Sequence, residues 1–164
     1  QWKEALEQLR KSDPQGYLHF VKLHEGKGHW MDRQDAEAIA WMHPNVRNRF
    51  PRKIVWKQDD VVESRFYWIT VDPQAVRDRA LITAKVVDQS IEIEQSDLPA
   101  IGILLRDELV DMDQHVTIRM ADREWIHARV PRTIAVMDET LNQRGDPKGV
   151  YWGKVTVDLP PSKK

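Results

Sequence analysis

The chain has 164 residues, 41% of them hydrophobic and 31% charged, and its formal net charge is −1. This balance is that of a soluble globular domain, and the near-zero charge gives no basis for binding nucleic acid or an anionic membrane. Cysteine is absent, which excludes disulfides and thiolate zinc sites, and no apolar run approaches the roughly 20 residues that span a membrane.

The N-terminal arm, residues 1–45, has the pattern of one helix–strand–loop–helix unit. A helix is predicted first, because apolar side chains recur at spacings of three and four, at Trp2, Ala5, Leu6 and Leu9. Residues 17–23 are mostly apolar and rich in β-formers, which predicts a strand buried on both faces. Residues 32–42 begin with Asp32 as a cap and offer small and apolar packing positions, which predicts a second helix.

Two glycines precede a histidine in the loop of this arm, in the string Gly26-Lys27-Gly28-His29-Trp30. The string resembles the histidine loop of serine α/β-hydrolases of the esterase and prolyl-oligopeptidase-like kind. In that family the histidine follows the final strand, and the chain order is serine, acid, histidine. The resemblance covers residues 1–45 and implies that His29 is the general base of a catalytic triad.

The two other members of such a triad are not found in the sequence. None of the five serines lies in the nucleophile elbow Gly-x-Ser-x-Gly, and the acid is expected upstream of residue 1. The chain begins with Gln1 rather than methionine, so we expect a piece of a longer protein whose N-terminal hydrolase domain is missing. A periplasmic or secreted location is favoured for that parent. The alternative is an ordinary loop histidine whose glycines serve turn geometry alone.

A second region follows the arm. Residues 46–52 are polar, basic and proline-bearing, which predicts a linker, and residues 160–164 form a tail. Between them, β-branched or alternating runs predict strands at residues 54–57, 65–71, 80–87, 90–94, 101–105, 115–120, 124–128 and 150–159. Residues 133–143 change to a helical period, with Thr133 as the cap and an apolar stripe of Ile134, Met137 and Leu141.

These elements predict a mainly β fold. We expect an immunoglobulin-like antiparallel β-sandwich with one helix at residues 53–159, preceded by an α-β-α fragment of the implied α/β-hydrolase fold. Three strings of this region resemble an accessory β domain that follows some bacterial α/β-hydrolases: Phe66-Tyr67-Trp68, the acidic run at residues 107–111, and Arg144-Gly145-Asp146-Pro147. This second resemblance informs the architecture more than the chemistry.

Two groups of side chains in the second region could bind a ligand. The indoles predicted to lie in strands would stack on sugar rings if exposed and form core if buried, and they are Trp56, Trp68, Trp125 and Trp152. Asp107, Glu108, Asp111 and Asp113 offer oxygen ligands for calcium, but their spacing misses the EF-hand pattern and favours a solvated turn. The histidines have no metal-binding spacing either, so we predict no metal and no cofactor.

The predicted function is a non-catalytic C-terminal accessory region of a larger serine hydrolase, inactive by itself and carrying only the triad histidine. The alternatives are a free-standing carbohydrate-binding β-sandwich module, or a structural or assembly domain. The strand at residues 17–23 needs neighbours for its backbone groups, so we also expect a homodimer through residues 1–45, with docking of these residues on the chain's own β domain as the alternative. The positions expected to be buried there are Trp2, Leu6, Phe20, Val21 and Trp41.

Overall fold

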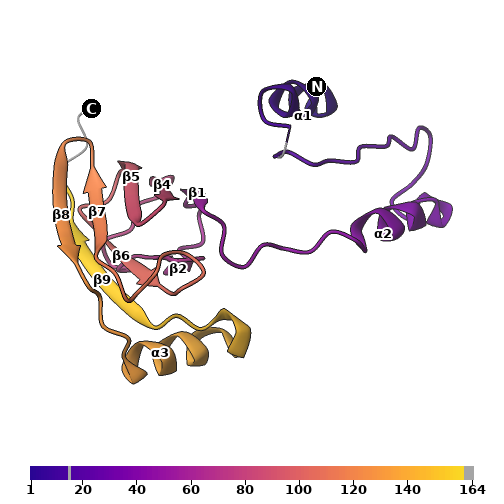
Figure 1. Cartoon of the computed structure of the whole chain (residues 1–164). Helices are drawn as coiled ribbons and strands as arrows, with labels where there is room; N and C mark the ends of the chain where they lie inside the picture. Colours follow the sequence, from indigo (N-terminus) through magenta and orange to yellow (C-terminus); the bar gives the residue numbers. More distant parts are fainter. Residues whose placement is uncertain (15, 161–164) are drawn as a thin grey trace. The chain divides into compact units, whose positions relative to one another are not determined.

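The computed structural model describes residues 1–14 and 16–160 (Figure 1). The chain divides into two compact units, Gln1–Arg47 and Asn48–Lys164. The described residues contain nine strands in two sheets and three α-helices, so the chain is mixed α/β with a mainly β, sandwich-like second unit. No helix in this part of the chain is long and apolar enough to cross a membrane. The predicted tail lies, apart from Pro160, outside the described residues.

The first unit contains α1 (Trp2–Ser12), the 3-10 helix η1 (Met31–Arg33) and α2 (Ala36–Met42). The helix predicted from the amphipathic spacing forms as α1. An ion pair between Lys3 and Glu7, one turn apart, stabilises it. The second helix starts later than predicted. Asp32 has a φ of 50°, outside the helical region, so it is not the cap, and Asp35 takes that position.

The predicted strand at residues 17–23 is absent from the structure. The segment has no ladder partner among the described residues, because its sequence neighbours are helices and a strand forms only beside another strand. Its main local contacts are the stacking of Phe20 on Trp41, with ring centroids 5.9 Å apart, and an ion pair between Lys22 and Glu37. No described residue of the first unit is buried.

The second unit is built from two sheets. The first has the order β1-β4-β5-β7-β8, formed by β1 (Lys53–Lys57), β4 (Leu81–Val87), β5 (Ser90–Ser96), β7 (Val116–Met120) and β8 (Arg123–Ala128). The second has the order β2-β3-β6-β9, formed by β2 (Arg65–Phe66), β3 (Ile69–Thr70), β6 (Ala100–Leu105) and β9 (Gly153–Asp158).

One strand pair departs from the predicted antiparallel pattern. β5 and β7 run parallel, with Ile91 opposite Ile118, whereas the other pairs of the described residues are antiparallel. The cause is the connection between them: after β5 the chain crosses to the other sheet as β6 and then returns. Such a crossover brings the next strand back in the same direction, which a hairpin does not.

The strand predicted at residues 65–71 is instead a short hairpin of β2 and β3. Tyr67 has a φ of 52°, which turns the chain after two residues. The turn carbonyls are used elsewhere: that of Tyr67 accepts from Arg65 Nε at 3.1 Å, and that of Trp68 accepts from the Leu104 amide at 2.8 Å. An aromatic, β-branched run thus satisfies its backbone groups without forming one continuous strand.

The third helix, α3 (Ile134–Arg144), forms as predicted, but it buries a different face. Thr133 Oγ1 caps it by accepting from the Val136 amide, and Gly145 ends it with a φ of 62°. Ile134 is 82% exposed, so the predicted apolar stripe is wrong. The buried residue is Thr140, whose hydroxyl accepts from the Tyr151 amide at 3.0 Å. The helix therefore packs on the chain before β9 through Thr140, and Val136 is its apolar contact with the core.

The core lies in the second unit. Its buried apolar side chains come from both sheets, and the largest fully buried ones are Trp68 and Tyr151. Trp68 Nε1 donates to the Pro51 carbonyl at 2.7 Å, and the Phe50 ring meets Tyr151 edge-on. Residues 50–52, in the predicted linker, are therefore packed within this unit.

Candidate functional site

His29, the predicted triad base, is exposed in the loop that precedes η1. Gly26 turns this loop with a φ of 67°, a conformation that favours glycine, and the Lys27 amide bonds the His24 carbonyl at 3.3 Å. The imidazole meets the Trp30 ring edge-on, with centroids 5.2 Å apart. Within the described residues its side chain forms no hydrogen bond, so both ring nitrogens are available to groups outside this unit.

The four indoles considered for sugar stacking do not share an exposed face. Trp68 is fully buried and Trp56 is 6% exposed, with its ring stacked on Phe66. Trp125 and Trp152 are half-buried against the core. Arginine guanidinium groups also lie over their rings, Arg123 over Trp125 and Arg106 over Trp152. A stacking platform needs free ring faces, which this arrangement does not offer.

The acidic cluster is partly neutralised by arginines. Arg132 donates to Asp107 at 2.8 Å and to Asp113 at 2.7 Å, so its guanidinium lies between the two carboxylates. The hydrogen bond from Arg132 lowers the pKa of Asp113. Glu108 is instead paired with Arg106. No cluster of three or more metal-ligating side chains was found among the described residues.

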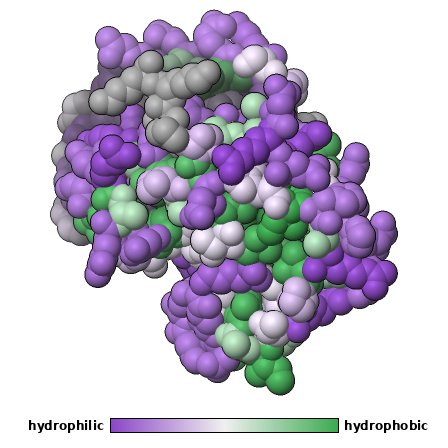
Figure 2. Space-filling model, turned by 90° about the vertical axis from the view of Figure 1, so that its left-hand side faces the viewer, coloured by the Kyte–Doolittle hydropathy of each residue, from purple (hydrophilic) through white to green (hydrophobic). Residues whose placement is uncertain are grey.

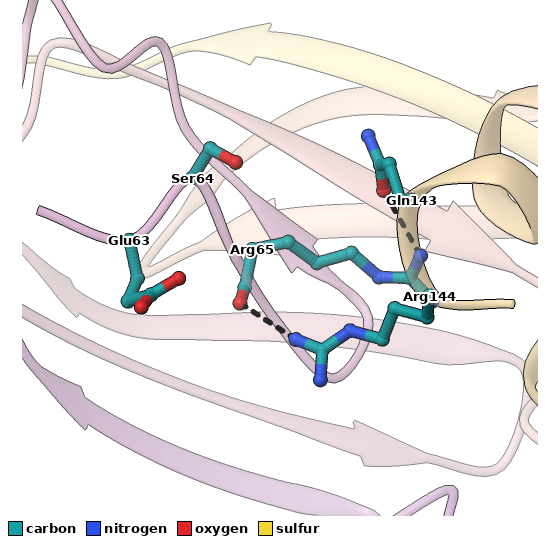
Figure 3. A pocket seen from close by; sticks show the side chains of 5 residues that line it. All are labelled: Glu63, Ser64, Arg65, Gln143 and Arg144. Carbon is teal, nitrogen blue, oxygen red and sulfur yellow. Dashed lines mark hydrogen bonds between the residues drawn. The ribbon is translucent and has the colours of Figure 1, made fainter.

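A polar pocket lies in the second unit, and no pattern in the sequence predicts it. It has a volume of about 400 Å³ and is lined by Glu63, Ser64, Arg65, Gln143 and Arg144 (Figure 3). Its walls come from the segment that leads into β2 and from the end of α3. Because these positions are nearly 80 residues apart in the chain, no local motif could have revealed the pocket.

Hydrogen bonds hold the two arginines of the pocket in place. Arg65 donates through Nη1 to Gln143 Oε1 at 3.0 Å, and Arg144 donates through Nη2 to the Arg65 carbonyl at 3.1 Å (Figure 3). A second pocket, of about 520 Å³, shares Ser64 and Gln143 with the first. The further polar side chains that line it include Thr70, Asp72, Glu139, Lys154 and Thr156.

Comparisons with protein-family models, with curated proteins and with solved structures found no match to this chain. What the protein does is therefore inferred from its own residues. Two features carry such inferences: the first unit with His29, and the pocket lined by Arg65 and Arg144.

Proposed function

We propose that this chain is a non-catalytic accessory region of a larger serine hydrolase of the esterase or peptidase-like kind. The observation that carries the proposal is the first unit, which places His29 on an exposed glycine turn yet buries none of its described residues. Leu23 is 81% exposed and Leu18 53% exposed, although both belong to an apolar run. Such a segment gains little from its own packing, so it becomes stable only against another surface.

In this proposal the other surface is the hydrolase domain. Residues 17–23 become its last strand once a neighbouring strand supplies hydrogen-bond partners. His29 Nε2 then takes the proton of the nucleophilic serine, while the acid holds the other ring nitrogen. Serine and acid both come from the parent domain, so the chain alone has no nucleophile to activate.

The second unit is the accessory domain in this proposal. An immunoglobulin-like sandwich is its proposed finer fold, supported by two sheets that share one core. The parallel β5–β7 pair is a departure from the all-antiparallel form of that fold. The alternative of a carbohydrate-binding module that stacks sugars on its four tryptophans is not favoured, because Trp56 and Trp68 are buried.

The isolated chain is expected not to hydrolyse p-nitrophenyl acetate, and His29→Gln is expected to leave its background rate unchanged. In a longer protein that includes the upstream hydrolase domain, the same substitution should lower kcat by at least about 10⁴-fold, because the serine loses its base. Turnover by the isolated chain that disappears with His29→Gln contradicts the proposal. So does an upstream reading frame without a Gly-x-Ser-x-Gly motif.

The isolated chain is also expected to form a homodimer through residues 1–45. Hydrophobic side chains lie exposed among hydrophilic ones (Figure 2), and several belong to this arm, with Trp2 and Trp30 each 83% exposed. None of the five positions expected to be buried, Trp2, Leu6, Phe20, Val21 and Trp41, is buried within one chain. Pairing two copies would cover such surface, as it covers free strand edges.

Light scattering tests the dimer. The full chain should have twice the 19.3 kDa mass of one copy, and a chain lacking residues 1–45 should be monomeric. The shortened chain keeps the whole core, which begins at Ile54. A full-length Phe20→Asp/Leu23→Asp variant is the matched control, because it keeps the arm but opposes apolar contact. If wild type and shortened chain are both monomers at the same concentration, the dimer is wrong.

A further inference from the structure

The pocket of Figure 3 contains a buried positive charge without a carboxylate partner. Arg65 is only 7% exposed. The acceptors of its hydrogen bonds are all neutral: the carbonyls of Tyr67, Thr140 and Gly149, and Gln143 Oε1. Arg144 lies beside it, and within the described residues neither arginine forms an ion pair. Two cationic groups therefore share one pocket.

A second buried arginine in the same unit has its charge compensated by a carboxylate. Arg106 is 8% exposed, and it donates from both Nε and Nη2 to the carboxylate of Glu108. Burying a charge without a counter-charge is costly, and buried charges in proteins are generally paired. Arg65 has no carboxylate partner of the kind that Glu108 provides for Arg106. Burial lowers the pKa of Arg65, and the nearby positive charge of Arg144 adds to this effect.

We propose that this pocket binds the carboxylate or phosphate group of a small polar ligand between Arg65 and Arg144. Arg144 uses one N–H on the Arg65 carbonyl, which leaves its remaining donors for an anion. Arg65 uses four of its five N–H groups within the protein, so it contributes mainly its charge. A planar guanidinium suits both oxyanions, because it can bind two oxygens at once. Ser64 is exposed at the same pocket and offers a hydroxyl donor.

The second pocket holds the rest of the ligand in this proposal. It adjoins the anion site through Ser64 and Gln143 and adds the hydroxyls of Thr70 and Thr156. Its carboxylates are Asp72 and Glu139, of which Glu139 is paired with Lys154. Gly102 also lines it, and an added Cβ there would come within 2.1 Å of Thr70 Oγ1. Hydroxyl and amide groups suit a hydroxylated body, so a sugar acid or sugar phosphate is the chemical class that fits both pockets.

Glu63 is the one carboxylate that lines the anion site, and it provides an independent test. Its side chain is exposed and pairs with neither arginine. A negative charge at the pocket repels an incoming anion, so Glu63→Gln should strengthen binding of the same probe that Arg144→Gln weakens. A purely structural role of these side chains predicts no such opposite pair of effects.

The experiment is calorimetric titration of the full chain with inorganic phosphate, D-glucuronate and D-glucose at low ionic strength. We expect saturable binding of at least one of the two anions and none of glucose. Arg144→Gln should weaken that binding at least about tenfold, since a hydrogen bond to a charged group is lost. Arg129→Gln is the control for net charge, because Arg129 is exposed and its side chain makes no hydrogen bond or ion pair within the described residues.

Comparison of the two anions identifies the ligand group, because binding of phosphate alone indicates a phosphate and binding of glucuronate a carboxylate. Circular dichroism confirms that each variant is folded, and Arg65 is left unchanged because its substitution threatens the fold. Two results overturn the proposal. One is the absence of saturable binding for both anions; the other is equal weakening by Arg144→Gln and Arg129→Gln. Either result would mean that Arg65 only stabilises the fold through its hydrogen bonds within the second unit.

Discussion

Trp68→Ala is expected to lower the free energy of unfolding by about 4 kcal/mol, the range found when a fully buried large aromatic is truncated. Trp68 is 0% exposed and belongs to the core shared by both sheets. Its indole also donates to the Pro51 carbonyl at 2.7 Å, which would lose its partner. A loss of this size is a large part of the stability of a typical domain.

Urea denaturation followed by circular dichroism measures this effect, and Ile134→Ala is the matched control. The control removes a large apolar side chain of the same unit from a position that is 82% exposed. Surface substitutions of that kind usually change stability by no more than about 0.5 kcal/mol. If both variants shift the midpoint equally, Trp68 does not hold the core together.

The regular strands of the second unit could be predicted because burial alternates along them. In β4 the side chains of Ile82, Ala84 and Val86 are buried, while those between them are not. The sequence likewise predicts the β7–β8 hairpin, from its alternation and turn, and Val116 and Ile118 of β7 are buried, although burial does not alternate along β8. In β4 and β7 one face of the strand meets the core, so the local pattern records the tertiary environment.

Other elements depended on contacts that a local pattern does not contain. Residues 17–23 have the composition of a strand but lack a neighbouring strand among the described residues. Their composition alone therefore predicted a strand that does not form. The buried face of α3 is set by Thr140, which bonds the Tyr151 amide across a turn of the chain. An apolar stripe is a poor guide where a helix packs through hydroxyl and backbone groups.

The candidate sites differ in the same way. The loop of His29 could be found in the sequence because its glycines and histidine are adjacent. The buried arginines could not be found, since their partners are distant in sequence: Arg106 reaches the Val150 carbonyl, 44 residues away. Arginine is also among the residues least often buried, so no sequence signal distinguished Arg65 or Arg106 from surface residues.

Arg106 is the subject of the last prediction, because it joins several segments of the second unit. Its guanidinium carbon lies 3.9 Å from the centre of the Phe50 ring and 5.2 Å from that of Trp152. Nη1 donates to the carbonyls of Lys148 and Val150 at 3.2 and 2.8 Å. Arg106→Met keeps an apolar stem but leaves both carbonyls without a hydrogen-bond donor. It should therefore lower the free energy of unfolding by about 3 kcal/mol.

Arg132→Met is the matched control, since Arg132 also lies over the Trp152 ring and also binds carboxylates. Its side chain is 34% exposed and its partner Asp113 is 79% exposed, so water replaces most of what is lost. Loss of such a surface pair costs no more than about 1 kcal/mol.

Arg106→Lys should not restore stability, because an ammonium cannot bind Glu108 and two carbonyls with the geometry of a planar fork. Urea midpoints of the three variants decide the question: if Arg106→Lys matches the wild type, the charge of Arg106 matters and its fork does not.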